Sequence, residues 1–491
     1  MNKILSAHQS KEIDRLMIEE LQIPGIVLME QAATAVANAV CEMCEKNDRI
    51  LCICGGGNNG GDGWAAARIL LTRGYNVTVG ATTLDLPRDA AANAALFSHT
   101  CHPTIVDASN IDGFFSANND AAVIIDALFG IGLSREPGGI YKNIIEHIND
   151  HSAKVVSVDI PSGVFCDNGH CTVGVNADVC VTFQYTKLCH HLFPGRAHTG
   201  RLVLAPIGVL AEEPASNVFL IDGFRMPPRK ADANKGSFGR LGIIAGSRGM
   251  SGAAVMSARA AISSGAGLTT VLTCGFTVGV LQNNISEVMA RDISTDPNKL
   301  LDPKVSLVDL SGFSAIAIGM GLGNDPSLFE FISKISKSNI PKVIDADALN
   351  ILSADSGFTF GDNTVVTPHP KEFSRLSGES IGEILGDPIN SAMAFAKARN
   401  TVVLLKGATT VVADGEKAYL ITRGTPAMAK GGSGDVLSGI VGSFLAQGLP
   451  CEVAAYGAAY CAGAAGEAAA AEKGEYSPTA NDTIRHLRVD K

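Results

Sequence analysis

The feature that most constrains the fold is a glycine-rich turn between a short apolar strand and a helix. The chain runs from the strand ILCIC at Ile50 through GGGNNGGDG to the helical segment WAAARILLTRG and then to a second strand, NVTVG. This order is typical of a βαβ unit, whose two strands lie parallel in one sheet. Two more buried strands follow, AAVIID and VVSVDIP, each ended by glycine or proline turns. The segment 6–44 has the apolar spacing of a helix, and we expect it to cover one sheet face.

A second α/β series follows a change in composition between Ile207 and Lys235. That stretch is rich in proline and charge and poor in bulky residues, which predicts a linker. Beyond it, strands such as RLGIIAGS, LTTVLT, AIAIGMG and TVVLLKG alternate with helical segments, and no fixed-period repeat joins the two halves. A chain of 491 residues is also too long for one ordinary core. We predict an α/β protein with domains at 1–212 and 225–491.

Composition and charge narrow the classes of partner. The formal net charge is −10, which gives no electrostatic footprint for nucleic acid or an anionic membrane. The start of the chain becomes charged within a few residues, and no later stretch has the length and apolarity of a membrane span. We therefore expect a cytoplasmic protein that binds small molecules, with neither nucleic acid nor membrane as a partner.

The twelve cysteines are scattered without the density of a disulfide scaffold or a repeated metal spacing. Cys41 and Cys44 form a CxxC pair, but their Ala- and Glu-rich surroundings favour helix packing over zinc or redox chemistry. We expect all of these thiols to be reduced.

The glycine turn contains a G-x-G-x-x-G that begins at Gly55. Backbone N–H groups of such a turn and the following helix N-terminus can hold a pyrophosphate. The acidic ribose ligand expected at the end of the next strand is missing, which argues against an ordinary hydride-transfer Rossmann domain. The additional polar residues Asn58, Asn59 and Asp62 either cap the turn or contact a ligand.

Four polar residues are predicted at the carboxyl ends of strands, namely Asn59, Asp126, Asp159 and Ser162. Open α/β sheets bind ligands at this edge, and oxygen ligands gathered there could hold a hard monovalent cation. The neighbouring segment GIGLSRE is flexible enough to approach a ligand, and its Arg135 can contact a phosphate.

The segments LMEQAA, GGGNNGGDG, DALFGIGL, VDIPSGV and TFQYTKLCHHLFPGRAHTG together resemble the YjeF N-terminal domain, the NAD(P)H-hydrate epimerase family, over residues 1–212. The resemblance implies a Rossmann-like three-layer αβα fold and a potassium ion bound by Asn59, Asp126 and Ser162. The residues that it implies for binding the hydrated dinucleotide are Asn58, Asn59, Gly60, Gly61, Asp62, Gly130, Ile131, Gly132, Leu133, Ser134, Arg135, Glu136 and Asp159.

Epimerisation inverts the hydrated ring carbon, so the ring must open or lose water and then close again, with proton transfer by positioned groups. Asp159 and Lys187 are our acid–base candidates, although Lys187 could instead be a solvated surface lysine. The chain departs from the family pattern at Gln31, Ala33 and Cys189, and we expect these departures to affect the rim of the site more than its core.

In the second half, GGSGDVLSG places Gly434 and Asp435 at the start of an apolar helix. A glycine turn exposes backbone N–H groups to an anion at the positive end of the helix dipole, and Asp435 is placed as a base for phosphoryl transfer. The alternative is a capping aspartate in a glycine-rich turn.

The segments GSFGRLGIIAGSRGMSGAA, GMGLG, DADALN, TPHPKEF, LKGATT and GGSGD occur in one order and resemble the ADP- or ATP-dependent NAD(P)H-hydrate dehydratase family, with its ribokinase-like fold, over residues 225–491. The resemblance implies a hydrated-dinucleotide site formed by Ala253, Gly321, His369 and Asp435. The nucleotide site that it implies consists of Lys406, Gly407, Ala408, Thr409, Thr410 and Gly434.

Several details of this second site stay open. Magnesium is expected with ADP, because phosphoryl transfer needs the nucleotide charge neutralised. The sequence does not assign a protein ligand for it, and Glu372 is a guess. His369 lies between two prolines and could instead form a rigid turn. The chain departs from the family pattern at Asn234 and Cys461, neither of which is the proposed base.

Together the two halves predict a bifunctional repair enzyme. The first would interconvert the R and S forms of hydrated NADH or NADPH, and the second would dehydrate the S form while converting ADP to AMP and phosphate. ATP is the other candidate phosphoryl donor. The alternative is a ribokinase-like small-molecule kinase fused to a noncatalytic nucleotide-binding or dimerisation module. We also expect a homo-oligomer, because the C-terminal region is Ala-rich and apolar.

Overall fold

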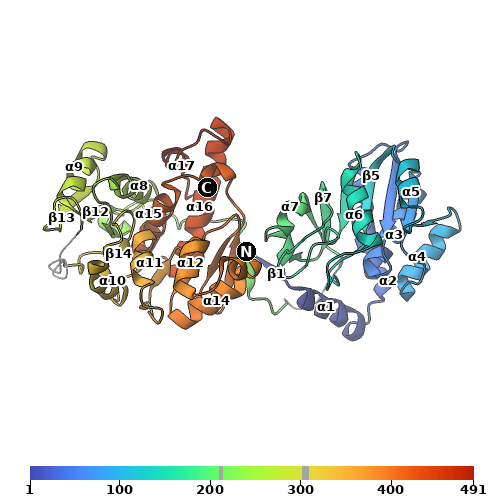
Figure 1. Cartoon of the computed structure of the whole chain (residues 1–491), viewed down its shortest axis with the longest axis horizontal. Helices are drawn as coiled ribbons and strands as arrows, with labels where there is room; N and C mark the ends of the chain where they lie inside the picture. Colours follow the sequence, from blue (N-terminus) through green and yellow to red (C-terminus); the bar gives the residue numbers. More distant parts are fainter. Residues whose placement is uncertain (209–213, 301–308, 491) are drawn as a thin grey trace. The chain divides into compact units, whose positions relative to one another are not determined.

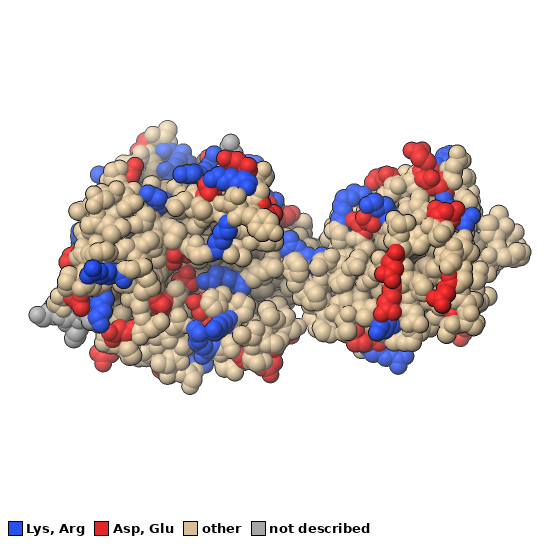
Figure 2. Space-filling model, turned by 45° about the horizontal axis from the view of Figure 1, so that its top comes forward, with Lys and Arg blue, Asp and Glu red and all other residues tan. Residues whose placement is uncertain are grey.

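The computed structural model describes residues 1–208, 214–300 and 309–490. It divides into two compact units: Lys3–Ser216, here the N-terminal unit, and Asn217–Lys491 with Met1–Asn2, here the C-terminal unit. Both units are α/β, as predicted (Figure 1). On the face shown in Figure 2, acidic and basic side chains are interspersed over each unit.

The N-terminal unit is built on a sheet in which every pair of neighbouring strands is parallel. In spatial order the strands are β4 (Thr104–Ile105), β3 (Asn76–Ala81), β2 (Arg49–Cys54), β5 (Ala121–Ala127), β6 (Lys154–Val158), β7 (Val179–Phe183) and β9 (Arg201–Ala205). The chain winds outward in opposite directions from β2 and β5. This pair is therefore the topological switch point, outside whose carboxyl ends a doubly wound sheet binds its ligands.

Helices cover both faces of this sheet. One layer contains α2 (Gly25–Cys41), α3 (Asn58–Thr72) and α4 (Arg88–Ser98), which pack on one another, and the other contains α5 (Ile111–Ala117) and α6 (Ile140–Asp150). The strands between them are buried on both sides, which explains their continuous Val, Ile and Cys runs. The predicted Rossmann-like three-layer fold is confirmed.

Two local expectations differ from the structure. The segment 6–44 is not one helix, because α1 (Ala7–Arg15) runs into a π-helical turn at Leu16–Glu20 before α2 begins. Helix α3 begins at Asn58, so the polar part of GGGNNGGDG forms the first helical turn instead of a preceding loop. The smaller elements are β1 (Asn2–Leu5), which pairs with β8 (Thr186–Lys187), then a 3-10 turn at Leu188–His190 and α7 (Gly195–Thr199).

The C-terminal unit contains a larger mixed sheet. In spatial order its strands are β13 (Met289–Asp292), β12 (Leu268–Thr273), β11 (Arg240–Ile244), β14 (Ala315–Ile318), β15 (Lys342–Ile344), β16 (Thr364–Val366), β17 (Val402–Leu405), β18 (Thr410–Ala413), β19 (Ala418–Ile421) and β10 (Val218–Leu220). Neighbours from β13 to β17 are parallel, while β17, β18 and β19 form an antiparallel meander. β10 lies inside the stretch predicted as linker, where the short run VFL pairs with β19.

Two groups of helices pack against this sheet. One group contains α8 (Ser251–Ser263), α15 (Ser433–Ala446), α16 (Cys451–Lys473) and α17 (Ala480–His486), with α9 (Gly275–Asn284) beside α8. The other contains α10 (Phe329–Ser336), α11 (Ala346–Leu352), α12 (Pro370–Ser377), α13 (Ile381–Gly386) and α14 (Pro388–Arg399). Small residues bring α8 and α15 close together, since a Cβ on Gly439 would lie 2.3 Å from the Ser257 carbonyl oxygen.

Among the described residues, every helix is too short or too polar to cross a membrane. The cysteines of both units are free thiols.

Candidate active sites

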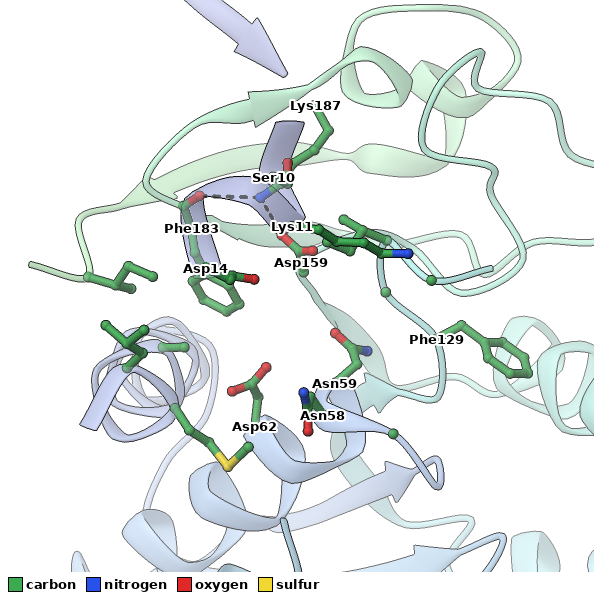
Figure 3. A pocket seen from close by; sticks show the side chains of 18 of the residues that line it. Ser10, Lys11, Asp14, Asn58, Asn59, Asp62, Phe129, Asp159, Phe183 and Lys187 are labelled. Carbon is green, nitrogen blue, oxygen red and sulfur yellow. Dashed lines mark hydrogen bonds and ion pairs between the residues drawn. The ribbon is translucent and has the colours of Figure 1, made fainter. Parts of the chain in front are cut away.

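The N-terminal unit contains a pocket of about 650 Å³ at the switch point of its sheet (Figure 3). Its walls come from α1, from the first turn of α3, from Gly130–Leu133 and from the segments that carry Asp159 and Lys187. Figure 3 shows polar side chains from these elements directed toward one cavity, which makes this the candidate epimerase site.

Glycines let α3 begin unusually close to the sheet. A Cβ on Gly60 would lie 1.9 Å from the Gly55 carbonyl oxygen, and one on Gly55 would lie 2.1 Å from the Leu128 carbonyl oxygen. No side chain fits at either position, so the first and last glycines of the G-x-G-x-x-G are a packing requirement here. It sets Asn58 and Asn59, and the free N–H groups of the helix start, at the pocket.

Asp159 and Lys187 form a buried ion pair, so the alternative of a solvated lysine is wrong. The Lys187 Nζ lies 2.6 Å from Asp159 Oδ1 and donates to Thr182 Oγ1 at 2.8 Å and to the Phe183 carbonyl at 3.2 Å. Burial alone would raise the pKa of Asp159, but the adjacent ammonium and its hydrogen bond hold it below the usual value. Burial likewise opposes the ammonium form of Lys187, yet Asp159 keeps the pKa of Lys187 above its usual value. The pair is therefore a carboxylate beside an ammonium.

Two further carboxyl groups line the same pocket, and their pKa values move the other way. Asp14 is exposed on α1, but desolvation by the protein around it raises its pKa to about 6, opposed in part by the Lys187 charge. Burial also raises the pKa of Asp62 well above its usual value, with the charges of Asp159 and Asp14 adding to the effect. The pocket thus combines an ionised carboxylate with carboxyl groups that hold protons at higher pH, as a site for acid–base chemistry requires.

The sequence analysis did not identify Asp14. It lies on α1, one helical turn after Ser10, and both residues line the pocket. The spacing of Ser10 and Asp14, four residues apart, places both on one face of a helix and could have indicated a shared site. This spacing alone does not show which face of the helix contacts a ligand.

Of the predicted potassium ligands, Asp126 and Ser162 are buried and hydrogen-bonded to each other, while Asn59 lines the pocket. Ser162 donates its backbone N–H to Asp126 Oδ2 at 2.9 Å, and its Oγ accepts the Phe129 N–H at 2.9 Å. Asn59 Oδ1 approaches Gly130, where a Cβ would lie 2.9 Å away. Asp126 is buried inside the end of β5, and no ion pair to it occurs among the described residues. A buried carboxylate with neighbouring neutral oxygens fits a monovalent cation.

The segment 130–136 divides in two. Gly130–Leu133 line the pocket, but Ser134, Arg135 and Glu136 are exposed and lie outside its lining. Glu136 pairs instead with His170 at 3.1 Å. Gly60 and Gly61 are buried in the packing of α3, so their contribution to a ligand site is through the backbone.

The positions where the chain departs from the epimerase pattern are not in the pocket lining. Gln31 is exposed on α2, Ala33 is buried in the core between α2 and the sheet, and Cys189 is buried beside Cys166. None of them contributes to the described wall of the cavity.

In the C-terminal unit, the candidate base Asp435 lies in the first turn of α15, and Gly432 is the residue before that helix with φ +97°. A Cβ on Gly434 would meet only Lys406 Nζ at 3.6 Å and Asp345 Oδ2 at 3.7 Å. The glycine turn therefore leaves the helix N-terminus open toward Lys406 and Asp345, as an anion site requires.

Asp345 is the buried centre of this site, and the sequence analysis gave it no role. It follows β15 and accepts hydrogen bonds from Lys406 Nζ at 3.0 Å and from Ser438 Oγ at 2.6 Å. Burial, with the negative charge of Asp345 second, raises the pKa of Asp435 to about 7, although Lys406 opposes the shift. A carboxyl group with such a pKa is suited to accept a proton near neutral pH.

Other predicted residues converge on the same region. A Cβ on Gly321, whose φ is +64°, would lie 3.0 Å from the Ala253 Cβ, so these two predicted substrate contacts adjoin. Lys406 follows β17 and begins the turn that leads to Thr410 at the start of β18. The predicted nucleotide segment is thus the connection of the β17–β18 hairpin.

His369 caps helix α12. Its Nδ1 accepts the N–H groups of Lys371 and Glu372 at 3.1 and 3.3 Å, while Glu372 accepts the His369 N–H at 2.9 Å. A carboxylate oxygen of Glu372 also lies 3.9 Å from Lys406 Nζ. His369 thus caps α12 through its Nδ1 and its backbone N–H, and its Nε2 lies 3.4 Å from Oε1 of Glu372, next to Lys406.

No group of three or more His, Cys, Asp or Glu placed to hold a metal ion occurs in the part of the chain that the structure describes. Magnesium usually takes one or two carboxylates together with nucleotide phosphates. The one predicted candidate, Glu372, lies beside Lys406, and its carboxylate accepts the His369 N–H.

Two α/β units, each with an open helix N-terminus beside buried carboxylates, are typical of an enzyme that binds phosphorylated ligands. Residues 25–189 match the family model for the YjeF-related protein N-terminus, and residues 241–487 match the model for NAD(P)H-hydrate dehydratase. The chain belongs to the family of bifunctional NAD(P)H-hydrate repair enzymes. A member from Moorella thermoacetica is 36% identical over 99% of this chain and 96% of its own length.

A second member, from Escherichia coli, is 35% identical over 96% of this chain and 91% of its own length. Among solved structures, the ADP/ATP-dependent NAD(P)H-hydrate dehydratase from Bacillus subtilis, co-crystallised with ATP/Mg2+, is 27% identical with a TM-score of 0.47. The match covers 54% of this chain and 92% of that one.

Proposed function

We propose that this chain restores hydrated NADH and NADPH in two steps: the N-terminal unit epimerises the hydrate, and the C-terminal unit removes its water with ADP. The observation that carries the proposal is the family membership, which extends over both units. It favours a repair enzyme over the alternative of a small-molecule kinase fused to a noncatalytic module. The buried pair of Asp159 with Lys187 and the open turn before Asp435 supply the chemistry.

In the epimerase step, the pyrophosphate would lie on the start of α3 and on Gly130–Leu133, with the hydrated ring toward Asp159. The Asp159 carboxylate accepts the proton of the ring hydroxyl as the bond between the ring nitrogen and the hydrated carbon breaks. Closure on the opposite face returns that proton and inverts the carbon. The electron pair of that bond goes to the ring nitrogen until closure returns it, and Lys187 stabilises the negative charge that this creates. Asn59, Asp126 and Ser162 would hold a potassium ion, which would supply fixed positive charge.

In the dehydratase step, Asp435 accepts the proton of the ring hydroxyl while that oxygen attacks the terminal phosphoryl group of ADP, which releases AMP. Phosphate then departs from the ring carbon and a ring proton is lost, which restores the double bond of the nicotinamide ring. The N–H groups at the start of α15 and Lys406 stabilise the charge of the transferred group. Glu372 would hold a magnesium ion, which would supply neutralisation of the phosphate charge. Ala253, Gly321 and His369 complete the proposed substrate site.

The test is repair of separated hydrate epimers by the purified full-length protein. With ADP, the S form should return nicotinamide absorbance directly, and the R form should do so after epimerisation. Parallel reactions with ATP in place of ADP distinguish the phosphoryl donors, and reactions with sodium in place of potassium test the cation. Absence of repair of the S form with either nucleotide would refute the dehydratase assignment. A failure with the R form alone would refute only the epimerase assignment.

A further inference from the structure

His190 connects the two members of the epimerase pair through the backbone. Its Nδ1 accepts the N–H of Lys187 at 3.0 Å, and its Nε2 lies 2.9 Å from the carbonyl oxygen of Asp159. Because Nδ1 is an acceptor, the ring proton must be on Nε2, which donates to Asp159. One imidazole therefore bonds to both residues, and it uses each nitrogen in a different role.

The bond to Asp159 acts on an unusual backbone conformation. Asp159 has φ +66°, a value that non-glycine residues rarely adopt, and the N–H of Ile160 bonds to the Val158 carbonyl at 2.8 Å. This is a tight three-residue turn centred on Asp159, of the kind that is strained for an L-residue. Such a conformation persists only where its surroundings hold it. The Asp159 carbonyl accepts from His190 and, more weakly, from the Cys180 thiol at 3.3 Å.

His190 does not reach the pocket. It is 3% exposed and does not belong to the pocket lining, so it has no contact with a bound dinucleotide. The charged groups that face it are Lys187 and Asp159, and burial, with Lys187 second, lowers the pKa of His190 to about 4. The ring is thus neutral at working pH and keeps a single tautomer, which suits a structural hydrogen-bonding role rather than proton transfer.

We propose that His190 is a positioning residue for epimerisation: its Nε2 bond holds the turn that aims the Asp159 carboxylate at Lys187 and into the pocket. The inference rests on the proposed epimerase function. Loss of this bond lets the Asp159 turn relax, which moves the carboxylate without removing it. A shift of a reacting group by about 1 Å can cost about 100-fold in rate.

The test separates the two ring nitrogens. In H190N the amide oxygen can take the place of Nδ1 as acceptor from Lys187, but nothing reaches the Asp159 carbonyl. In H190Q the longer amide N–H₂ can take the place of Nε2 and donate to Asp159. We expect the epimerase kcat to fall about 10- to 100-fold in H190N with KM changed less than about threefold, and H190Q to recover kcat to within about threefold of wild type.

The neighbouring His191 supplies a matched control. It is equally buried, but its Nε2 lies 2.9 Å from Thr186 Oγ1 and not near Asp159, so H191N should keep the epimerase kcat. Dehydration of the S form by the same samples verifies that the chain is intact. Should H190N be insoluble, His190→Met, which has a similar volume and no donor, replaces it.

Equal epimerase kcat in H190N and H190Q, or a loss in H191N as large as in H190N, would overturn the inference while leaving the proposed function standing. A wild-type protein that does not interconvert the epimers would instead overturn the proposed function, and this role of His190 with it.

Discussion

Asp435 is the residue whose ionisation should govern dehydration. Its pKa is raised to about 7 by burial and by Asp345, so below that pH it carries a proton and cannot accept one from the ring hydroxyl. We expect the dehydratase rate to rise with pH through about 7 and then to level off. Asp435→Asn should lower this rate by a factor on the order of 10² to 10⁴, the usual contribution of a general base, and leave epimerisation intact. The absorbance of restored NADH, followed from pH 5.5 to 9 with S-form hydrate and ADP, measures both.

In the epimerase pocket, Asp14 is expected to act while protonated, because its pKa is raised to about 6 and it shares a cavity with the ionised Asp159. A proton donor is lost as pH rises through its pKa, so the wild-type epimerase rate should decline above about 6. Asp14→Asn should slow epimerisation roughly tenfold or more and abolish that decline. Glu12→Gln, an exposed carboxylate on the same helix, is the control. An Asp14→Asn protein with the wild-type pH profile would contradict this role.

Among individual residues, short sequence motifs predicted those whose role depends on local backbone geometry. Asp435 and Gly434 occur together in GGSGD, and the structure places both at an open helix start. Asp14 and His190 were missed because their roles depend on contacts between segments far apart in the chain. His190 contacts Asp159, which lies 31 positions earlier in the chain, and no short sequence pattern predicts a bond over that separation.

Among the elements, the junction of β2 and α3 depends on Gly60. A Cβ on Gly60 would lie 1.9 Å from the Gly55 carbonyl oxygen, so the absence of a side chain allows the helix to begin this close to the strand. Gly60→Ala should destabilise the N-terminal unit by about 3 kcal/mol, the cost of forcing atoms into a filled space. We expect epimerase activity to be lost at a lower temperature than in wild type, while the dehydratase keeps its own inactivation temperature. Gly57→Ala, where nothing lies within 4 Å of a new Cβ, should leave both unchanged.

The long buried strands and the order of the α/β units could be predicted from apolar runs and glycine turns. Short edge strands could not. The three residues of β10 lie in a stretch whose composition indicates a linker, and they become a strand only because β19 offers an unpaired edge. The π-helical turn at Leu16–Glu20 also escaped prediction, since its apolar spacing is close to that of an α-helix.

For the whole molecule, the division into two compact units predicts that the two reactions are separable. Asp159→Ala should repair only the S form, and Asp435→Asn should repair neither form while still interconverting them. An equimolar mixture of the two variants should then clear R-form hydrate with ADP, because the epimerised product can diffuse from one chain to the other. The rate of the mixture against each variant alone is the measurement. A mixture that leaves the R form untouched would show that the two sites must belong to one chain.

The family match to the N-terminal unit begins at residue 25, whereas the pocket takes Ser10, Lys11 and Asp14 from α1. A chain trimmed to the matched residues would keep the sheet and the glycine turn but lose one wall of the cavity. Such a shortened protein would still match the family model through its strands. We expect it to bind its ligand weakly. We therefore expect the catalytic competence of this half to depend on α1, which lies before the first matched residue.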